Sequence, residues 1–439
     1  MKFQITIFLF SISNVLISQT DIIQLCKSGA INQLTITDNL PQILDNDLIF
    51  YGFIHGAAMP QEIEAKLLKE LMDEGIKYYA PEVSYSGAYF LNKYLQSGNM
   101  EFLKYVLRLY IAPQDASLQW IQKYEDLYKY KTENNLQLTV IGTDIEQNDN
   151  LITSHLAYIL GERKTANEII DSLSLFKTPE EDIAIWSGKP LYKLSIKYGY
   201  SNKKILYESH SQHNYTSRYF EYYLNNRQLV LEAFGTDSIE VKIILDDHLM
   251  RENSREEFIT KNFIERVLPL IDNGEKVYSN FGYAHVLQSE LNDNLYLAGR
   301  LKESNPDLKI YSILTHMADS EVLKNKKYCK EGSIRRYGKK IRLASICGSI
   351  TSKKLDGNTK DEKILGIDEL RTKTNKGEIT LVALNSIREE DLRKRYYLDY
   401  ISGKNPDGLR FESDKSTLDY FQGLIFIRGS SANEPYENY

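Results

Sequence analysis

Two histidines, a glutamate and an arginine are the residues of this chain whose types and positions suit acid–base chemistry. His55 and Glu82 each follow a short apolar run, His285 follows a later one, and Arg255 stands at the beginning of a predicted helix. One imidazole can remove a proton from water, a carboxylate can orient that imidazole, and a second imidazole or a guanidinium can bind the developing oxyanion. The set predicts a hydrolytic site with these four residues as its catalytic groups.

Four neighbouring residues are candidates for substrate binding. Tyr85 and Asp144 follow predicted strand ends, while Tyr283 and Glu256 adjoin His285 and Arg255 in the sequence. A tyrosine offers a ligand both an apolar face and a hydroxyl. Each candidate alone has a plainer interpretation as a helix cap, an ion pair or a structural hydrogen bond. Their joint position after successive strands is what favours a site.

Strand-like and helix-like segments alternate along the chain. The predicted strands are 47–53, 77–83, 136–142, 275–280, 308–314, 379–384 and 424–427, and the predicted helices include 60–75, 86–98, 101–110, 117–131, 225–234, 256–271 and 287–302. Such alternation is typical of βαβ units, and open sheets of this kind bind ligands at the carboxyl ends of their strands. We expect an α/β fold with a mixed, mostly parallel sheet flanked by helices.

Two stretches interrupt this alternation. Residues 150–235 are polar and rich in tyrosine, and their pattern predicts a helical insertion or lid that covers the cleft at the strand ends. After Thr315 the chain becomes rich in glycine and lysine, and residues 350–378 are predicted to form a charged surface loop. Residues 21–439 are therefore expected to form a single domain.

The first twenty residues differ from the rest of the chain. Residues 1–20 carry one charge, Lys2, followed by an apolar run and then by small polar residues, which is the pattern of a secretory signal peptide. Polar residues interrupt the run before it reaches the length of a membrane-spanning helix. We expect a secreted or periplasmic protein with no membrane insertion after the signal is removed.

Composition and cysteine content exclude several other classes. The formal net charge of −6 gives no support for binding nucleic acid. Three cysteines are too few for a disulfide scaffold or a four-thiolate zinc site, although Cys329 and Cys347 are able to pair in an oxidising compartment. No phosphate-binding glycine loop and no Gly-x-Ser-x-Gly elbow occurs. A small-molecule substrate is the expected partner, and the oligomeric state is left open.

Read in order, these segments resemble the erythromycin esterase-like family. The resemblance covers essentially the whole mature chain, and its most specific part is the strand end that reads Ala80-Pro81-Glu82-Val83-Ser84-Tyr85 with the following helix. The other matching segments are Tyr51-Gly52-Phe53-Ile54-His55-Gly56, Asn92-Lys93-Tyr94-Leu95-Gln96-Ser97-Gly98, Gly142-Thr143-Asp144, the segment from Arg255 to Asn262, Gly282-Tyr283-Ala284-His285, Leu297-Ala298-Gly299-Arg300-Leu301 and Leu424-Ile425-Phe426-Ile427.

The resemblance implies a metal-independent hydrolase of an ester or lactone bond that uses no cofactor. It implies that His55 is the general base for water and that Glu82, His285 and Arg255 share its cleft. The chain departs from the family pattern at four places: Gly52 stands where the family has a glutamate, Ile54 replaces a hydroxyl residue, Glu256 replaces an aspartate, and only one histidine, His285, remains in the last motif.

These departures leave two further readings open. The first is a catalytically degenerate member that binds a small ligand or partner without turnover, because Gly52 removes one carboxylate of the family's cleft. The second is a metal-dependent hydrolase, since His55, Glu82 and His285 are acceptable ligand types, although a tight His-x-x-x-His spacing is absent.

Overall fold

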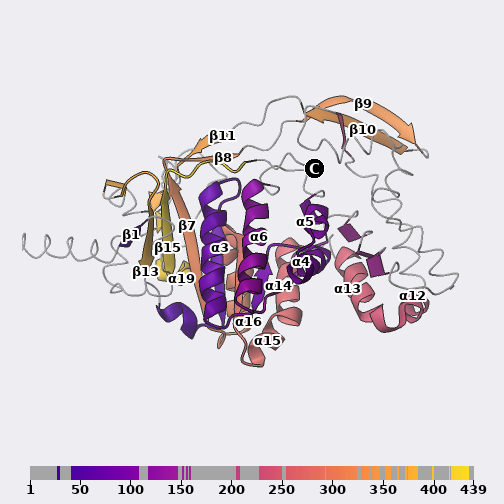
Figure 1. Cartoon of the computed structure of the whole chain (residues 1–439), viewed down its shortest axis with the longest axis horizontal. Helices are drawn as coiled ribbons and strands as arrows, with labels where there is room; N and C mark the ends of the chain where they lie inside the picture. Colours follow the sequence, from indigo (N-terminus) through magenta and orange to yellow (C-terminus); the bar gives the residue numbers. More distant parts are fainter. Residues whose placement is uncertain are drawn as a thin grey trace, which may run out of the picture.

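An eight-stranded sheet lies at the centre of the computed structural model (Figure 1), in the strand order β1-β13-β15-β7-β2-β6-β3-β4. The strands from β15 to β4 run parallel, whereas β1 and β13 pair antiparallel at one edge. Their bounds are β1 Lys27–Gly29, β2 Leu48–Phe53, β3 Tyr78–Pro81, β4 Thr139–Val140, β6 Val277–Gly282, β7 Ile310–Ala318, β13 Ile379–Ala383 and β15 Gly423–Arg428. The predicted α/β fold with a mixed, mostly parallel sheet is confirmed.

The structure describes residues 27–29, 41–107, 117–146, 151–152, 155–156, 158–159, 204–207, 227–249, 254–291, 293–323, 328–336, 339–346, 352–356, 363–364, 371–372, 374–383, 398–399, 415 and 417–434. The predicted signal peptide and Cys347 lie outside these residues. No helix within the described residues is both long and apolar enough to span a bilayer.

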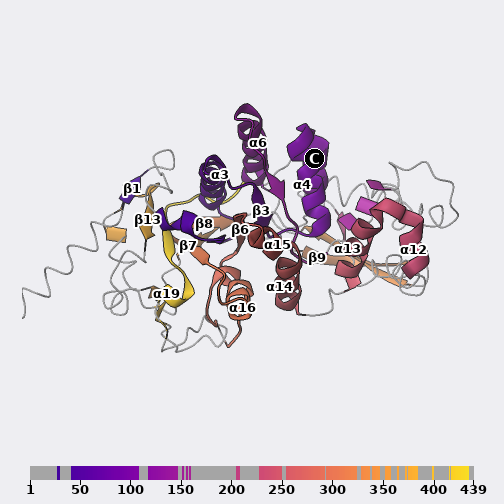
Figure 2. The same ribbon diagram turned by 90° about the horizontal axis from the view of Figure 1, so that it is seen from below.

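Helices cover both faces of the sheet, as the view from below shows (Figure 2). On one face lie α3 Ala58–Asp73, α4 Tyr85–Ser97 and α6 Leu118–Glu133, and on the other lie α14 Arg255–Arg266, α15 Leu268–Asp272, α16 Leu297–Ser304 and α19 Thr417–Tyr420. The helix α5 Met100–Leu107 packs in the core of the first face. A central strand must then be apolar on both sides. β2 meets this need, since Ile49 and Tyr51 pack in the core of the first face and Leu48 and Phe50 in that of the second.

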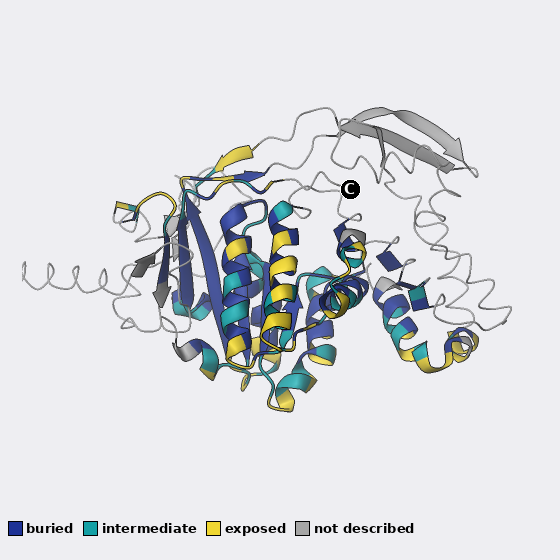
Figure 3. Ribbon diagram, viewed as in Figure 1, coloured by how far each residue is buried: buried dark blue, intermediate teal, exposed yellow. Residues whose placement is uncertain are grey.

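The burial pattern explains why these helices form where they do. Along α3 the buried residues Ile63, Leu67, Leu68 and Leu71 recur at helical spacing. Figure 3 shows the buried stripes of α3 and α6 facing the sheet and the exposed residues facing outward. Ser84 caps α4 by accepting a hydrogen bond from the backbone of Gly87 at 3.2 Å. This cap fixes the start of α4 at Tyr85, three residues after Glu82.

Part of the predicted insertion packs as a separate cluster. A small core that includes Ile152, Leu156, Phe234 and Ile244 is shared by the helical residues 151–152, 155–156 and 158–159, by α12 Arg227–Phe234 and by α13 Ser238–Leu249. The 3-10 turn η3 Gly235–Asp237 joins the two helices. The insertion is not wholly helical, because β5 Lys204–Tyr207 pairs with β10 Lys339–Ile346.

Two predicted elements differ from the structure. The helix expected over 287–302 is present only as α16, because Leu291 and Asn294 pair their backbones in a tight turn and Asp293 adopts a φ of 60°. The surface loop expected over 350–378 contains β11 Ser352–Leu355 and β12 Lys363–Ile364. β11 forms because it pairs with β8 Ser320–Leu323, and β12 pairs with β14 Leu398–Asp399.

Candidate active site

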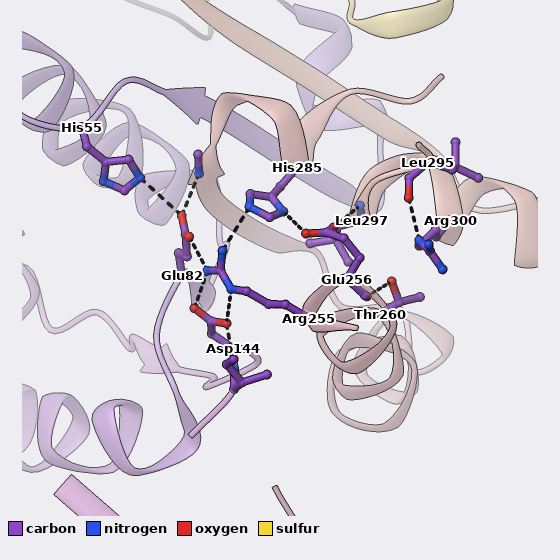
Figure 4. Close-up of polar contacts among 12 residues, drawn as sticks. His55, Glu82, Asp144, Arg255, Glu256, Thr260, His285, Leu295, Leu297 and Arg300 are labelled. Carbon is purple, nitrogen blue, oxygen red and sulfur yellow. Dashed lines mark hydrogen bonds and ion pairs between the residues drawn. The ribbon is translucent and has the colours of Figure 1, made fainter. Parts of the chain in front are cut away.

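Three neighbouring strands deliver the candidate residues to one edge of the sheet. β2 lies beside β6, with Phe53 opposite Gly282, and β6 lies beside β3, with Asn280 opposite Pro81. His55 follows β2, Glu82 follows β3, and His285 lies in the 3-10 turn η5 Tyr283–Val286 after β6. Figure 4 shows these side chains together with Asp144, Arg255 and Glu256. The parallel register therefore unites residues that are far apart in the sequence.

Arg255, the first residue of α14, holds two carboxylates together. Its Nε and Nη2 donate to Oδ1 and Oδ2 of Asp144 at 3.0 and 2.7 Å, and Nη2 also donates to Oε1 of Glu82 at 2.5 Å. Burial alone lowers the pKa of Arg255, but the hydrogen bonds and charges of Asp144 and Glu82 outweigh it and keep the pKa above its usual value. Arg255 is thus a permanent cation in a fixed orientation.

Glu82 is the centre of the ion network. Its Oε2 accepts a hydrogen bond from the backbone N–H of Gly282 at 2.8 Å and lies 3.8 Å from Nε2 of His55. Burial raises the pKa of Glu82, but the charges of His55, Arg255 and His285 outweigh this effect, so the pKa lies below its ordinary value. Asp144 behaves differently, because burial raises its pKa more than Arg255 lowers it. Glu82 is therefore the carboxylate that stays ionised beside His55.

A second His–carboxylate pair lies on the other side of Arg255. Nδ1 of His285 lies 2.8 Å from Oε1 of Glu256, without the alignment of a full hydrogen bond, and Oε2 of Glu256 accepts from the backbone of Leu297 at 3.1 Å. Nε2 of His285 faces Nη1 of Arg255 at 3.5 Å. The His285 side chain is only 12% exposed, against 41% for His55. His55 is consequently the imidazole open to solvent.

Both imidazoles and the carboxylate of Glu82 approach Gly282 from the same side. A Cβ atom placed on Gly282 would lie 3.5 Å from Nε2 of His55, 3.6 Å from Oε2 of Glu82 and 3.6 Å from Cδ2 of His285. These are ordinary van der Waals distances, so the three groups converge on the side of Gly282 that carries no side chain.

The eight predicted site residues do not all meet. His55, Glu82, Asp144, Arg255, Glu256 and His285 form one connected network, as Figure 4 shows. Tyr283 is half-buried at the start of η5 and packs against the core of the second face. Tyr85 lies elsewhere: the guanidinium of Arg266 lies 5.1 Å from the centroid of its ring, which also stacks on the ring of His155. Tyr85 therefore lies at the seam, by which we mean the contact of the insertion with α4 and α14.

That seam contains polar residues that the sequence reasoning did not select. His155 is fully buried, with Nδ1 3.1 Å from Oγ of Ser86 and Nε2 3.1 Å from Oε1 of Glu240 on α13. Nearby, Glu146 accepts a hydrogen bond from the backbone of Ser86 at 2.6 Å, and burial raises its pKa to about 7. Arg266 pairs with Asp247 of α13 at 2.7 Å. These contacts join the insertion to α4 and α14.

Gly52 has a structural reason to be glycine. A Cβ at this position would lie 2.3 Å from Cγ2 of Val286 and 3.2 Å from Cα of Tyr283, both in η5. β2 therefore lies directly against the turn that carries His285. A side chain at this position has no room unless η5 shifts, and the carboxylate next to His285 is that of Glu256.

Gly282 is the residue of this site that the sequence did not single out. It belongs to the segment that contains His285, but the sequence does not indicate that its backbone N–H donates to Glu82 or that both histidines approach it. Among the described residues, no group of three or more His, Cys, Asp or Glu side chains is arranged to hold a metal ion. The metal-dependent alternative therefore has no specific observation in its favour.

Comparisons with known proteins place this arrangement in a structural context. No protein-family model and no curated protein sequence matches the chain. Among solved structures, a succinoglycan biosynthesis protein has a TM-score of 0.56 at 14% identity, covering 95% of this chain and 97% of its own. A protein from Bacillus cereus has a TM-score of 0.52 at 14% identity, covering 93% and 95%. A variant of the erythromycin esterase EreC in its open conformation has a TM-score of 0.51 at 12% identity, covering 94% and 100%. These similarities show a shared fold.

Proposed function

We propose that this protein is a metal-independent hydrolase that cleaves an ester or lactone bond of a small molecule. His55 removes a proton from a water molecule, the hydroxyl oxygen forms a bond with the carbonyl carbon, and the carbonyl oxygen becomes an oxyanion. When this intermediate collapses, the bond to the alkoxy oxygen breaks and the imidazolium of His55 returns the proton to that oxygen. The products are a carboxylic acid and an alcohol, joined in one molecule when the substrate is a lactone.

The neighbouring residues supply the electrostatic support for this step. Glu82 lies 3.8 Å from Nε2 of His55 and stabilises its cation after proton transfer. Nε and Nη2 of Arg255 are bound to carboxylates, so Nη1, which faces His285, is the part of the guanidinium that is directed toward an oxyanion. Asp144 positions Arg255, and Glu256 positions His285.

The convergence of His55, Glu82 and His285 on one side of Gly282 is the observation that carries the proposal. We place the attacking water on this side, next to the imidazole nitrogen that takes its proton and to the carboxylate that stabilises the resulting cation. The structural similarity to an erythromycin esterase gives independent support for a hydrolase. The N-terminal pattern supports the proposal that the enzyme acts outside the cytoplasm, in the periplasm or the medium.

Hydrolysis of aryl esters and of a macrocyclic lactone by the purified protein tests this function. His55→Gln keeps a polar side chain of similar size but removes the base, and we expect a loss of at least about 100-fold in kcat/KM. A surface substitution on α14, Glu265→Gln, serves as the control, since that side chain is 51% exposed. Thermal unfolding of both variants verifies that the fold is retained.

Two results would reject the proposal in favour of the alternatives. Calorimetric binding of a lactone without turnover by the unmodified protein would favour a ligand-binding protein that has lost catalysis. Loss of hydrolysis on dialysis against a chelator, with recovery on adding a divalent metal, would favour a metal-dependent hydrolase. Unchanged rates in His55→Gln would remove His55 as the base.

A further inference from the structure

One short stretch of chain connects the proposed active site with the seam. Residues 142–146, which we call the linking segment, follow β4 and carry Asp144, whose carboxylate binds Arg255. The same segment carries Glu146, which accepts a hydrogen bond from the backbone of Ser86 at 2.6 Å. Asp144 and Glu146 are both buried. Because these two residues are so close along the chain, displacement of the segment at the seam also displaces the carboxylate in the active site.

The linking segment packs directly against the beginning of α4. A Cβ atom on Gly142 would lie 2.5 Å from Cα of Tyr85, so the two backbones are in close contact. The backbone N–H groups of Thr143 and Asp144 both donate to the carbonyl oxygen of Val83 at 3.0 Å. Val83 follows the glutamate of the ion network in the sequence. The segment therefore also contacts the strand end that carries this second carboxylate.

Arg266, the last residue of α14, binds the linking segment and the insertion at the same time. Its Nη1 donates to the carbonyl oxygen of Gly142 at 2.8 Å. Its Nη2 donates to Oδ1 and Oδ2 of Asp247 at 2.8 and 2.7 Å. Asp247 belongs to α13, which shares the small core of the insertion. The side chains of Arg266 and Asp247 are only 13% and 4% exposed, so little water is available to replace either contact.

A guanidinium suits this double role because its N–H donors are fixed in one plane. When Asp247 moves, the N–H group that binds Gly142 changes its direction as well. A second contact between α14 and the linking segment lacks this property: Asn262 donates to the carbonyl oxygen of Thr143 at 3.0 Å, and both residues belong to the domain. Arg266 is therefore the residue of α14 that joins the position of the insertion to the position of the segment.

We propose that Arg266 is a positioning residue that couples docking of the insertion to the orientation of Arg255 in the active site. Asp247 holds Arg266, and Arg266 holds the linking segment. The segment places Asp144, which fixes the guanidinium that the proposed reaction directs toward the oxyanion. When the insertion separates from α14, these contacts loosen and the transition state loses stabilisation. The effect on catalysis rests on the proposed function, whereas the coupling of α13 to the linking segment does not.

Two variants release Arg266 from the insertion in different ways. Asp247→Asn keeps the size of the side chain and removes its charge. Arg266→Lys keeps the charge but replaces the planar group by a single ammonium, which cannot bind Asp247 and the linking segment in the same geometry. Asp246→Asn is the matched control, because Asp246 is the neighbouring acid on α13 and pairs with Arg227 and Lys242, on α12 and α13.

Each protein is assayed for steady-state hydrolysis of an aryl ester and for amide hydrogen exchange of the linking segment, followed by mass spectrometry. We expect Asp247→Asn and Arg266→Lys to lower kcat by at least about fivefold, the lower end of typical coupling between sites. KM should stay unchanged, since the lost interaction is made in the transition state. The amides of the linking segment should exchange faster in both variants, and Asp246→Asn should match the unmodified protein in both measurements.

The proposal is overturned if kcat and hydrogen exchange in both variants equal those of the control. A raised KM with unchanged kcat would also overturn it, because the insertion would then bind substrate instead of orienting Arg255. If the unmodified protein hydrolyses no ester, the proposed function fails and hydrogen exchange alone decides the coupling. In that case faster exchange of the linking segment in both variants supports the coupling, and unchanged exchange rejects it.

Discussion

Replacing Gly282 by alanine adds one methyl group next to His55, Glu82 and His285. The added methyl carbon would lie 3.5 Å from Nε2 of His55 and 3.6 Å from both Oε2 of Glu82 and Cδ2 of His285, so it makes contact without a clash. The backbone of Gly282, with φ −51° and ψ 143°, is allowed for alanine. A glycine-to-alanine change at such a position stabilises a protein by roughly 0.4–1 kcal/mol.

In the proposed reaction the attacking water lies on this side of Gly282, so the added methyl group displaces it. Without a water in contact with its nitrogen, His55 cannot act as a general base, and this role contributes roughly 100- to 10,000-fold to rate. We expect Gly282→Ala to lower kcat/KM for ester hydrolysis by at least about 100-fold, with a melting temperature equal to or above that of the unmodified protein. Steady-state ester hydrolysis and thermal unfolding, measured on the same preparation, give both quantities.

Gly87→Ala is the matched control for this experiment. Its added Cβ would lie 3.5 Å or more from its nearest neighbours, within α4 and outside the ion network. It should retain full activity. Wild-type hydrolysis by Gly282→Ala would refute the position assigned to the water, and a large loss of stability would refute the geometry around Gly282 itself.

Three other substitutions test the packing and the charges of the fold. Burial raises the pKa of Glu146 to about 7 from its ordinary value of 4.5, so the folded state holds an extra proton between these pH values and its stability decreases as pH rises through them. The stability of Glu146→Gln relative to the unmodified protein should therefore rise by about 3 kcal/mol from pH 4 to pH 8. Equal pH profiles of the two proteins in urea unfolding would contradict this. Lys123 and Glu64 form a buried ion pair at 3.0 Å, so Lys123→Met leaves the carboxylate unpaired and should destabilise the fold by about 3–5 kcal/mol. The double variant Lys123→Met, Glu64→Leu should recover part of this stability. Additive losses of the two substitutions in chemical unfolding would argue against a direct pair. Gly52→Ala forces a methyl group against Val286 and should lower the free energy of unfolding by about 1–3 kcal/mol. The additional change Val286→Ala should reduce this loss. An unchanged melting temperature of Gly52→Ala would mean that β2 and η5 are not in this contact.

The sequence was informative about strands because both faces of a central parallel strand are buried. The apolar run at Leu48–Phe53 is a strand in the structure, and so is the run at Gly423–Arg428. It was less informative where pairing depends on a distant partner. No element was predicted over β9 Tyr328–Arg336 and β10, and these strands form because their backbones pair with each other and, for β10, with β5.

The ion network shows the same division at the level of single residues. A histidine after one strand and a glutamate after the next were identifiable because residue types at strand ends are visible in the chain. The bond from Arg255 to both Asp144 and Glu82, and the pairing of Glu256 with His285, depend on where α14 lies against the sheet. The position of a helix results from the packing of its apolar face. The periodicity of the sequence indicates which face is apolar but not the element against which it packs.

The sequence by itself determined the class of fold, the order of its elements and the residue types at the strand ends, because these follow from local periodicity and side-chain chemistry. Only the tertiary structure decided which of those residues meet, that Tyr85 stacks on His155 of the insertion, and that His55, Glu82 and His285 converge on Gly282. The physical reason is that strand register and helix packing are long-range contacts, whose energies depend on pairs of residues that no local pattern records.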